Sequence, residues 1–287
     1  MEHDGTLRIF DGAVAIITGG ASGIGRALSE ALGRRGASVV LADRQVTLAQ
    51  EVAGGIQERG GQASAVELDV TDFAAVDQFV QATVQAQGRL DYMFNNAGIA
   101  IGGEVRLCQI EDWDSVLNVN LHGVVNGVQA AYPIMLSQGY GHIVNTASMA
   151  GLLPMPAAVS YATTKHAVVG LSKSLRVEAA LYGIRVSVLC PGFIRTPILH
   201  GGKYGKNLQP MSPEVQEKFI RQYRPMDPAV FAEKVLDALA RNKALIIVPS
   251  WWRLFWWLSR LSPALEFSLA QRGYRSARKA MQSETDA

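Results

Sequence analysis

Two side chains that together could move a proton, Tyr161 and Lys165, stand four residues apart in a stretch with helical character, 159–182. This spacing places both side chains on one face of a helix. A free tyrosine has a pKa of about 10, so it is a poor acid or base at neutral pH. We expect the neighbouring ammonium to stabilise the phenolate and to lower the pKa of Tyr161. Ser148, just after the apolar stretch 142–147, could donate a hydrogen bond to a substrate oxygen or to a developing alkoxide.

A glycine-rich turn lies near the start of the chain, between an apolar run (13–18) and a helical stretch (23–36). It reads Thr18-Gly19-Gly20-Ala21-Ser22-Gly23-Ile24-Gly25, which is T-G-x-x-x-G-x-G and not G-x-G-x-x-G. Glycines let the backbone turn sharply and approach a pyrophosphate, whose charge the free N–H groups of a helix start favour. We therefore predict a dinucleotide site that uses Gly19, Ser22, Gly23, Ile24 and Gly25.

The residue that ends the second apolar run, Asp43, indicates which dinucleotide would bind. An acid in this position can accept hydrogen bonds from the ribose hydroxyls of NAD. It would also repel a 2′-phosphate, by about 4 kcal/mol at ~4 Å and an effective dielectric constant near 20. Arg44 could turn toward that phosphate, but the glycine turn contains no Lys or Arg to assist it. The sequence predicts NAD as the cofactor, with NADP as the alternative.

The elements that must position these residues alternate regularly along the chain. Strands are predicted at 13–18, 38–42, 63–68, 90–94, 142–147, 184–189 and 244–248, and helices at 23–36, 45–60, 72–88, 112–138, 159–182 and 228–241. Such alternation predicts an α/β fold: a Rossmann-like, doubly wound sheet of seven parallel strands in a single domain. Asp227-Pro228 and Ser212-Pro213 are typical helix starts, the second of them inside a long loop, 193–227.

Composition excludes several classes of protein. Lys and Arg are scattered among acids and the net charge is only +2, which does not indicate a nucleic-acid partner. The residues 1–10 lack the pattern of a signal peptide, and no run of about 20 apolar residues predicts a spanning helix. Two cysteines form no disulfide framework, so we expect a reduced cytoplasmic setting. The five histidines have no metal-ligand spacing, and no metal is expected.

Taken in order, these motifs resemble the short-chain dehydrogenase/reductase family over residues 11–248. The matching pieces are TGGASGIG (18–25), Asp43, Asp69-Val70, Asn95-Asn96-Ala97-Gly98, Asn120, Ser148, Tyr161-x-x-x-Lys165, Pro191-Gly192 and Thr196. The resemblance implies a catalytic set of Asn120, Ser148, Tyr161 and Lys165, in which Asn120 holds a water that links Lys165 to bulk solvent. It also implies hydride transfer between NAD and a secondary alcohol or ketone.

The same resemblance assigns cofactor contacts along the chain. Asp69 and Val70 would lie near the adenine, and Asn96, Ala97 and Gly98 near the ribose or nicotinamide. Pro191, Gly192, Ile194 and Thr196 would lie against the carboxamide, while Tyr161 and Lys165 also touch the cofactor. Family members usually form homodimers or homotetramers. Two alternative functions stay open: an NADPH-dependent ketone reductase, and a dinucleotide-sensing binding protein without catalysis. The intact catalytic set argues against the second of them.

The substrate pocket would be built largely from 99–107, 149–160 and 193–227. Its side chains are mostly apolar, which favours a bulky hydrophobic alcohol or ketone of steroid-, terpenoid- or lipid-like character. The residues concerned are Met149, Leu152, Leu153, Met155 and Phe193.

The residues after 249 depart from the family pattern, so we divide the chain into a dinucleotide-binding domain (1–249) and a helical extension (250–287). Four tryptophans fall within seven residues, at 251, 252, 256 and 257, and Pro263 breaks the helix. Arg253 and Arg260 form a narrow polar stripe, and Arg272, Arg275, Arg278 and Lys279 follow. Three interpretations stay open: packing on its own domain or on a second subunit, a cover over an apolar pocket, or peripheral membrane contact through 250–280.

Overall fold

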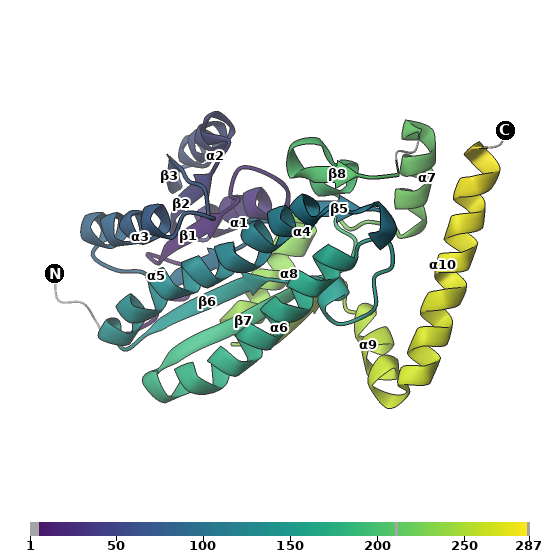
Figure 1. Ribbon diagram of the computed structural model, residues 1–287. Helices are drawn as coiled ribbons and strands as arrows, with labels where there is room; N and C mark the ends of the chain where they lie inside the picture. Colours follow the sequence, from purple (N-terminus) through teal and green to yellow (C-terminus); the bar gives the residue numbers. More distant parts are fainter. Residues whose placement is uncertain (1–5, 210–211, 286–287) are drawn as a thin grey trace.

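A computed structural model of the chain describes residues 6–209 and 212–285, and the expectations that fall on 1–5, 210–211 and 286–287 lie outside this range. Seven parallel strands form one sheet in the order β3-β2-β1-β4-β6-β7-β9 (Figure 1). They are β1 (Val14–Thr18), β2 (Ser38–Asp43), β3 (Gln62–Glu67), β4 (Tyr92–Asn95), β6 (Gly141–Thr146), β7 (Ile184–Pro191) and β9 (Leu245–Val248). The predicted doubly wound, Rossmann-like sheet is confirmed. Its strand order reverses next to β1, where ligands bind in such folds.

Helices cover both faces of the sheet, because successive strand residues point to opposite sides and both sides are apolar. On β1, Ala15 and Ile17 join one buried cluster and Ile16 joins the other. The first cluster is closed by α1 (Gly23–Arg34), α2 (Val46–Glu58) and α8 (Pro228–Ala240), and the second by α3 (Phe73–Gln87), α5 (Gly123–Gln138) and α6 (Val159–Ala179).

Local signals set several helix ends. The Asp227 carboxylate accepts hydrogen bonds from the backbone N–H groups of Ala229 (2.8 Å) and Val230 (3.3 Å), which confirms the predicted start of α8. The Ser212 hydroxyl caps α7 (Pro213–Gln222) in the same way, at Val215.

The predicted helix 112–138 is wrong as one uniform element. It divides into α4 (Ile110–Leu117), a π-helical turn (Asn118–His122) and α5. A π turn adds a residue to the helical repeat, which no hydrophobic period in the sequence reports.

The long loop 193–227 contains more structure than its composition indicates. Two short 3-10 turns, Pro197–His200 and Gly202–Tyr204, precede β8 (Gly205–Asn207), which pairs in parallel with β5 (Ala100–Gly102). This small second sheet was not predicted. The close pairing explains Gly205, because a Cβ there would lie 1.7 Å from the carbonyl oxygen of Ala100. The small sheet anchors the loop beside the segment that follows β4 (Figure 1).

The extension consists of two helices, α9 (Trp252–Leu261) and α10 (Pro263–Thr285), and Pro263 begins the second of them. The helix α9 follows β9 in the chain, and in Figure 1 α10 turns back along the side of the molecule. Among the described residues, no helix combines the length and the apolar character needed to cross a bilayer.

Candidate active site

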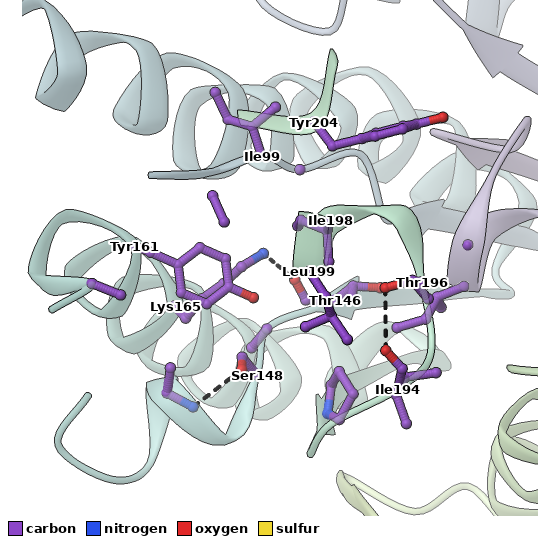
Figure 2. A pocket seen from close by; sticks show the side chains of 18 of the residues that line it. Ile99, Thr146, Ser148, Tyr161, Lys165, Ile194, Thr196, Ile198, Leu199 and Tyr204 are labelled. Atoms are coloured by element: carbon purple, nitrogen blue, oxygen red, sulfur yellow. Dashed lines mark hydrogen bonds between the residues drawn. The ribbon is translucent and has the colours of Figure 1, made fainter. Parts of the chain in front are cut away.

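A cavity of about 910 Å³ lies at the carboxyl ends of β1, β2, β4, β6 and β7. All but two of the sequence-predicted site residues line it, and the exceptions are Gly25 and Asn120. Figure 2 shows Tyr161, Lys165 and Ser148 toward one side of the view, and Ile198 and Thr196 toward the other. The topology therefore gathers segments that are far apart in the sequence around one space.

The glycine turn after β1 forms one wall of this cavity. Gly19 and Gly23 have φ angles of +65° and +51°, a region that side chains rarely adopt. A Cβ on Gly19 would lie 2.9 Å from the Cα of Ala97, and one on Gly25 would lie 2.0 Å from the carbonyl oxygen of Gly19. The absence of a side chain at Gly25 therefore allows it to pack against the backbone of Gly19. Gly25 itself does not line the cavity. The open wall fits the close approach of a pyrophosphate to backbone N–H groups.

Asp43 is fixed at the end of β2 by the backbone. One carboxylate oxygen accepts from the N–H of Ala21 (3.0 Å), and the other accepts from the N–H of Gln45 (2.9 Å). Each oxygen keeps a further lone pair for a ribose hydroxyl. Arg44, by contrast, is largely exposed and lies 3.6 Å from a carboxylate oxygen of Asp69, which also lines the cavity. The acid is therefore rigidly placed and the arginine is not.

A hydrogen-bond network joins the first strand to the segment after β4. The hydroxyl of Thr18 accepts from the N–H groups of Asn96 (2.9 Å) and Ala97 (3.1 Å), and donates to the carbonyl of Phe94 (3.2 Å). The Asn96 amide donates to the carbonyl oxygen of Thr18 at 3.1 Å. This network fixes Asn96 and Ala97 opposite the glycine turn.

The phenol of Tyr161 and the ammonium of Lys165 share the inner side of α6. The Lys165 nitrogen lies 5.4 Å from the centre of the Tyr161 ring and donates to the carbonyl oxygen of Thr146 at 2.9 Å. Tyr161 is hydrogen-bonded to Ser148, whose hydroxyl also accepts from the N–H of Ala150 at 3.1 Å. A proton donor or acceptor and a hydrogen-bonding hydroxyl therefore meet at one point of the cavity wall.

The ionisation of this pair differs from the sequence-based expectation. Burial raises the pKa of Tyr161, and the hydrogen bond from Ser148 opposes that rise only in part. Burial also lowers the pKa of Lys165 to about 8. The expected lowering of the pKa of Tyr161 by Lys165 is wrong for the protein groups alone, because burial has the largest effect on this pKa and only the hydrogen bond with Ser148 acts against it.

Asn120 lies in the π turn behind the cavity and is fully buried. Its side-chain amide makes two hydrogen bonds with the backbone of Ile99: the amide oxygen accepts from the N–H (2.8 Å), and the amide nitrogen donates to the carbonyl oxygen (2.9 Å). Gly98 lies between this amide and Lys165, since a Cβ there would be 3.3 Å from the Asn120 oxygen and 3.6 Å from the lysine nitrogen. Asn120 therefore positions the segment after β4 from behind.

The extension supplies cavity residues that the sequence did not identify: Trp252, Ala270, Gly273 and Tyr274. The Trp252 indole rests directly on Gly192, where a Cβ would lie 2.2 Å from the indole nitrogen. The Tyr274 hydroxyl donates to the carboxylate of Glu104 at 2.9 Å, so α10 is tied to the loop after β5. No local motif reports such contacts, because they depend on the angle at which the extension leaves the sheet. Two of the three interpretations of the extension, packing on its own domain and covering the pocket, therefore agree with the structure.

The substrate end of the cavity is mostly apolar. It includes Met149, Leu153, Met155 and Phe193 as expected, whereas Leu152 packs into the second buried cluster. Residues that the sequence did not single out complete this wall: Pro154, Pro156, Ile198, Leu199 and Tyr223. Residues 101–107 do not reach it.

The loop 193–227 also borders the end of the cavity where Asp43 lies. Thr196 packs against the glycine turn, 3.1 Å from where a Cβ of Gly23 would lie. Gln45, after β2, donates from its side chain to the hydroxyl of Tyr204 at 3.3 Å. One loop therefore borders both ends of the site. Tyr204 was not predicted as a site residue, because a single tyrosine in a loop does not by itself indicate a function.

Comparison with known proteins supports a common ancestry for most of the chain. A family model described as short chain dehydrogenase matches residues 13–204. Oxidoreductase UcpA of Salmonella typhimurium is 36% identical over 234 residues, 80% of this chain and 80% of the relative. A solved short chain dehydrogenase/reductase from Burkholderia phymatum in complex with NAD is 32% identical with a TM-score of 0.80, covering 90% of this chain and 96% of that one. Levodione reductase is 31% identical with a TM-score of 0.76, covering 83% and 96%.

Proposed function

The chain belongs to the short-chain dehydrogenase family, and we propose that it transfers a hydride between NAD(H) and a secondary alcohol or ketone with a bulky hydrophobic frame. The observation that carries this proposal is the meeting of Tyr161, Ser148 and Lys165 on the wall of a cavity that extends to Asp43. A similar solved structure holds NAD, which supports the choice of cofactor. We take 1–249 as the unit that carries this chemistry and 250–287 as the extension.

In the oxidative direction, Tyr161 takes the proton of the substrate hydroxyl and Ser148 donates a hydrogen bond to the same oxygen. Lys165 holds positive charge behind the phenol ring and keeps a donor available toward the nicotinamide ribose. NAD, when bound, accepts the hydride and brings a cationic ring that opposes the effect of burial on Tyr161. In the reductive direction, Tyr161 returns its proton to the oxygen of the ketone.

The cavity wall supports a hydrophobic substrate. Beyond Ser148, the lining consists of aliphatic and aromatic side chains, including Leu153, Phe193 and Trp252. Apolar walls with a few convergent polar groups are typical of sites that bind small organic molecules. An extended, poorly hydrated alcohol would bury more surface here than a short one, so catalytic efficiency should rise with the size of the apolar group.

The test follows NADH absorbance with secondary alcohols and ketones of graded size. Tyr161→Phe should lower turnover by about 10²- to 10⁴-fold while NADH binding, measured by fluorescence, stays unchanged. Tyr223→Phe is the matched control, because it removes a hydroxyl from the same cavity at a residue whose ring stacks on Phe193. Turnover of Tyr161→Phe near that of the control would remove Tyr161 from the mechanism.

A further inference from the structure

The outward face of α9 is apolar, which is the reverse of what a helix on the surface of a globular domain presents. Trp252 and Trp256 point inward and pack on the second buried cluster. Leu254 and Leu261 on the opposite side are 63% and 78% exposed, and Trp257 and Leu258 lie between them on the same face. We propose that this face, defined as Leu254, Trp257, Leu258 and Leu261, binds to the surface of an anionic lipid bilayer.

The apolar surface does not stop at the end of α9. Leu265, Phe267 and Leu269 in the first turns of α10 are also exposed. Large exposed apolar patches are uncommon on monomeric proteins and mark places where something else binds. Tryptophan is enriched where one side of a ring meets lipid and the other meets water, and two exposed tryptophans lie here, Trp251 just before α9 and Trp257 within it.

Charge favours an anionic bilayer as the occupant. Residues 250–280 contain six Lys or Arg and one acidic residue, whereas the whole chain carries a net charge of only +2. The rest of the chain is therefore slightly acidic, and the net positive charge of the chain comes from residues 250–280. Arg253 and Arg260 lie on one edge of α9, and both are exposed. A basic, amphipathic helix of this kind lies in the interface of a membrane and does not span it.

The two sides of the extension would connect the membrane to the cavity. The outward side would contact lipid, while Trp252, Ala270 and Tyr274 on the inward side line the substrate space. A hydrophobic alcohol dissolved in the bilayer could then enter the cavity beside α10 without crossing bulk water. This consequence rests on the proposed function, whereas membrane binding itself does not.

The experiment is co-sedimentation of the full chain with vesicles of phosphatidylcholine alone or mixed with phosphatidylglycerol. We expect binding to the anionic vesicles that weakens with added salt. Leu254→Gln with Leu258→Gln should lower the partition coefficient at least about tenfold. The matched control is Val66→Gln with Val230→Gln, two exposed aliphatic residues outside the extension, and it should bind like the original chain. Arg253→Gln with Arg260→Gln should lower binding to anionic vesicles about tenfold or more and should not change binding to neutral vesicles.

Three results would overturn the proposal. The first is that the original chain sediments with neither kind of vesicle, and the second is that the control loses as much binding as the leucine variant. Light scattering could also find a dimer that only the leucine variant dissociates, without vesicle binding, which would make this face a contact between two copies of the chain. Turnover of a water-soluble alcohol is measured in parallel and should not change in any variant. Absence of vesicle binding by the original chain with normal turnover therefore refutes the membrane surface alone, and failure of the Tyr161 test leaves the membrane result standing.

Discussion

Removing the negative charge of Asp43 should shift cofactor preference toward NADP. The carboxylate is held by the N–H groups of Ala21 (3.0 Å) and Gln45 (2.9 Å), so it cannot turn away from a 2′-phosphate. At ~4 Å and an effective dielectric constant near 20, the repulsion between two unit charges is about 4 kcal/mol. That energy corresponds to a change of up to about 10³-fold in the ratio of catalytic efficiencies with NADP and NAD. We therefore expect Asp43→Asn to raise this ratio by two to three orders of magnitude.

The same substitution has a structural cost that the geometry also predicts. Asparagine has one acceptor oxygen where the carboxylate has two, so one of the two backbone N–H groups loses its partner. An unsatisfied buried donor costs about 1–3 kcal/mol, which urea unfolding should detect. Asp43→Glu is the control, because it keeps the charge and should lower efficiency with NAD without any gain for NADP. An NADP-to-NAD ratio that stays the same in Asp43→Asn would refute the assignment of Asp43 to the cofactor ribose.

Three further predictions concern stability. Burial lowers the pKa of His142 to about 3 in the folded chain. Between about pH 3 and 6.5 the unfolded chain therefore binds more protons than the folded chain does. The free energy of unfolding should fall by about 2 kcal/mol from pH 7 to pH 5. His142→Gln should remove this loss and exposed His166→Gln should not; equal losses in both would contradict the argument. Asp91 forms a buried ion pair with Arg89 at 2.6 Å, so Asp91→Asn should lower the free energy of unfolding in urea by about 3–5 kcal/mol. A loss below about 1 kcal/mol would be typical of a surface pair and would contradict this prediction. Gly192→Ala should destabilise the chain because the new methyl group would clash with the indole of Trp252. The loss of unfolding free energy should therefore be smaller in a Trp252→Ala background, and additive effects of the two substitutions would argue against that contact.

The sheet and its order of elements were predictable because their signals are local. Most strands of the large sheet are short apolar runs, and several helices begin at or beside a glycine, proline or acid, as α1 does at Gly23, α3 after Asp72 and α8 at Pro228. The same holds for the glycine turn and Asp43, which lie at strand ends that the parallel sheet must bring to one edge. The positions of Tyr161 and Ser148 follow from this argument as well, since α6 and the end of β6 meet at that edge.

What could not be predicted depends on contacts between distant segments. The pairing of β5 with β8 joins two runs of three residues, too short for any period to reveal. The π turn at Asn118–His122 changes which residues face the cavity, and it brings Asn120 onto Ile99 from behind. The contact of Trp252 with Gly192 depends on the direction of α9, which a run of aromatic residues does not encode.

The pKa values of Tyr161 and Lys165, the pair that we propose to be catalytic, show what a spacing of four residues cannot predict. Four residues of separation place Lys165 beside Tyr161, but the ammonium donates to Thr146 and stands 5.4 Å from the ring centre. Burial then favours the neutral form of both groups, raising the pKa of the phenol and lowering that of the ammonium to about 8. A neutral phenol is the form that donates a proton to a ketone, so the protein groups by themselves favour the acid needed for reduction. In the oxidation that we propose, Tyr161 acts as the base, so we expect the cationic ring of bound NAD to oppose the effect of burial on its pKa.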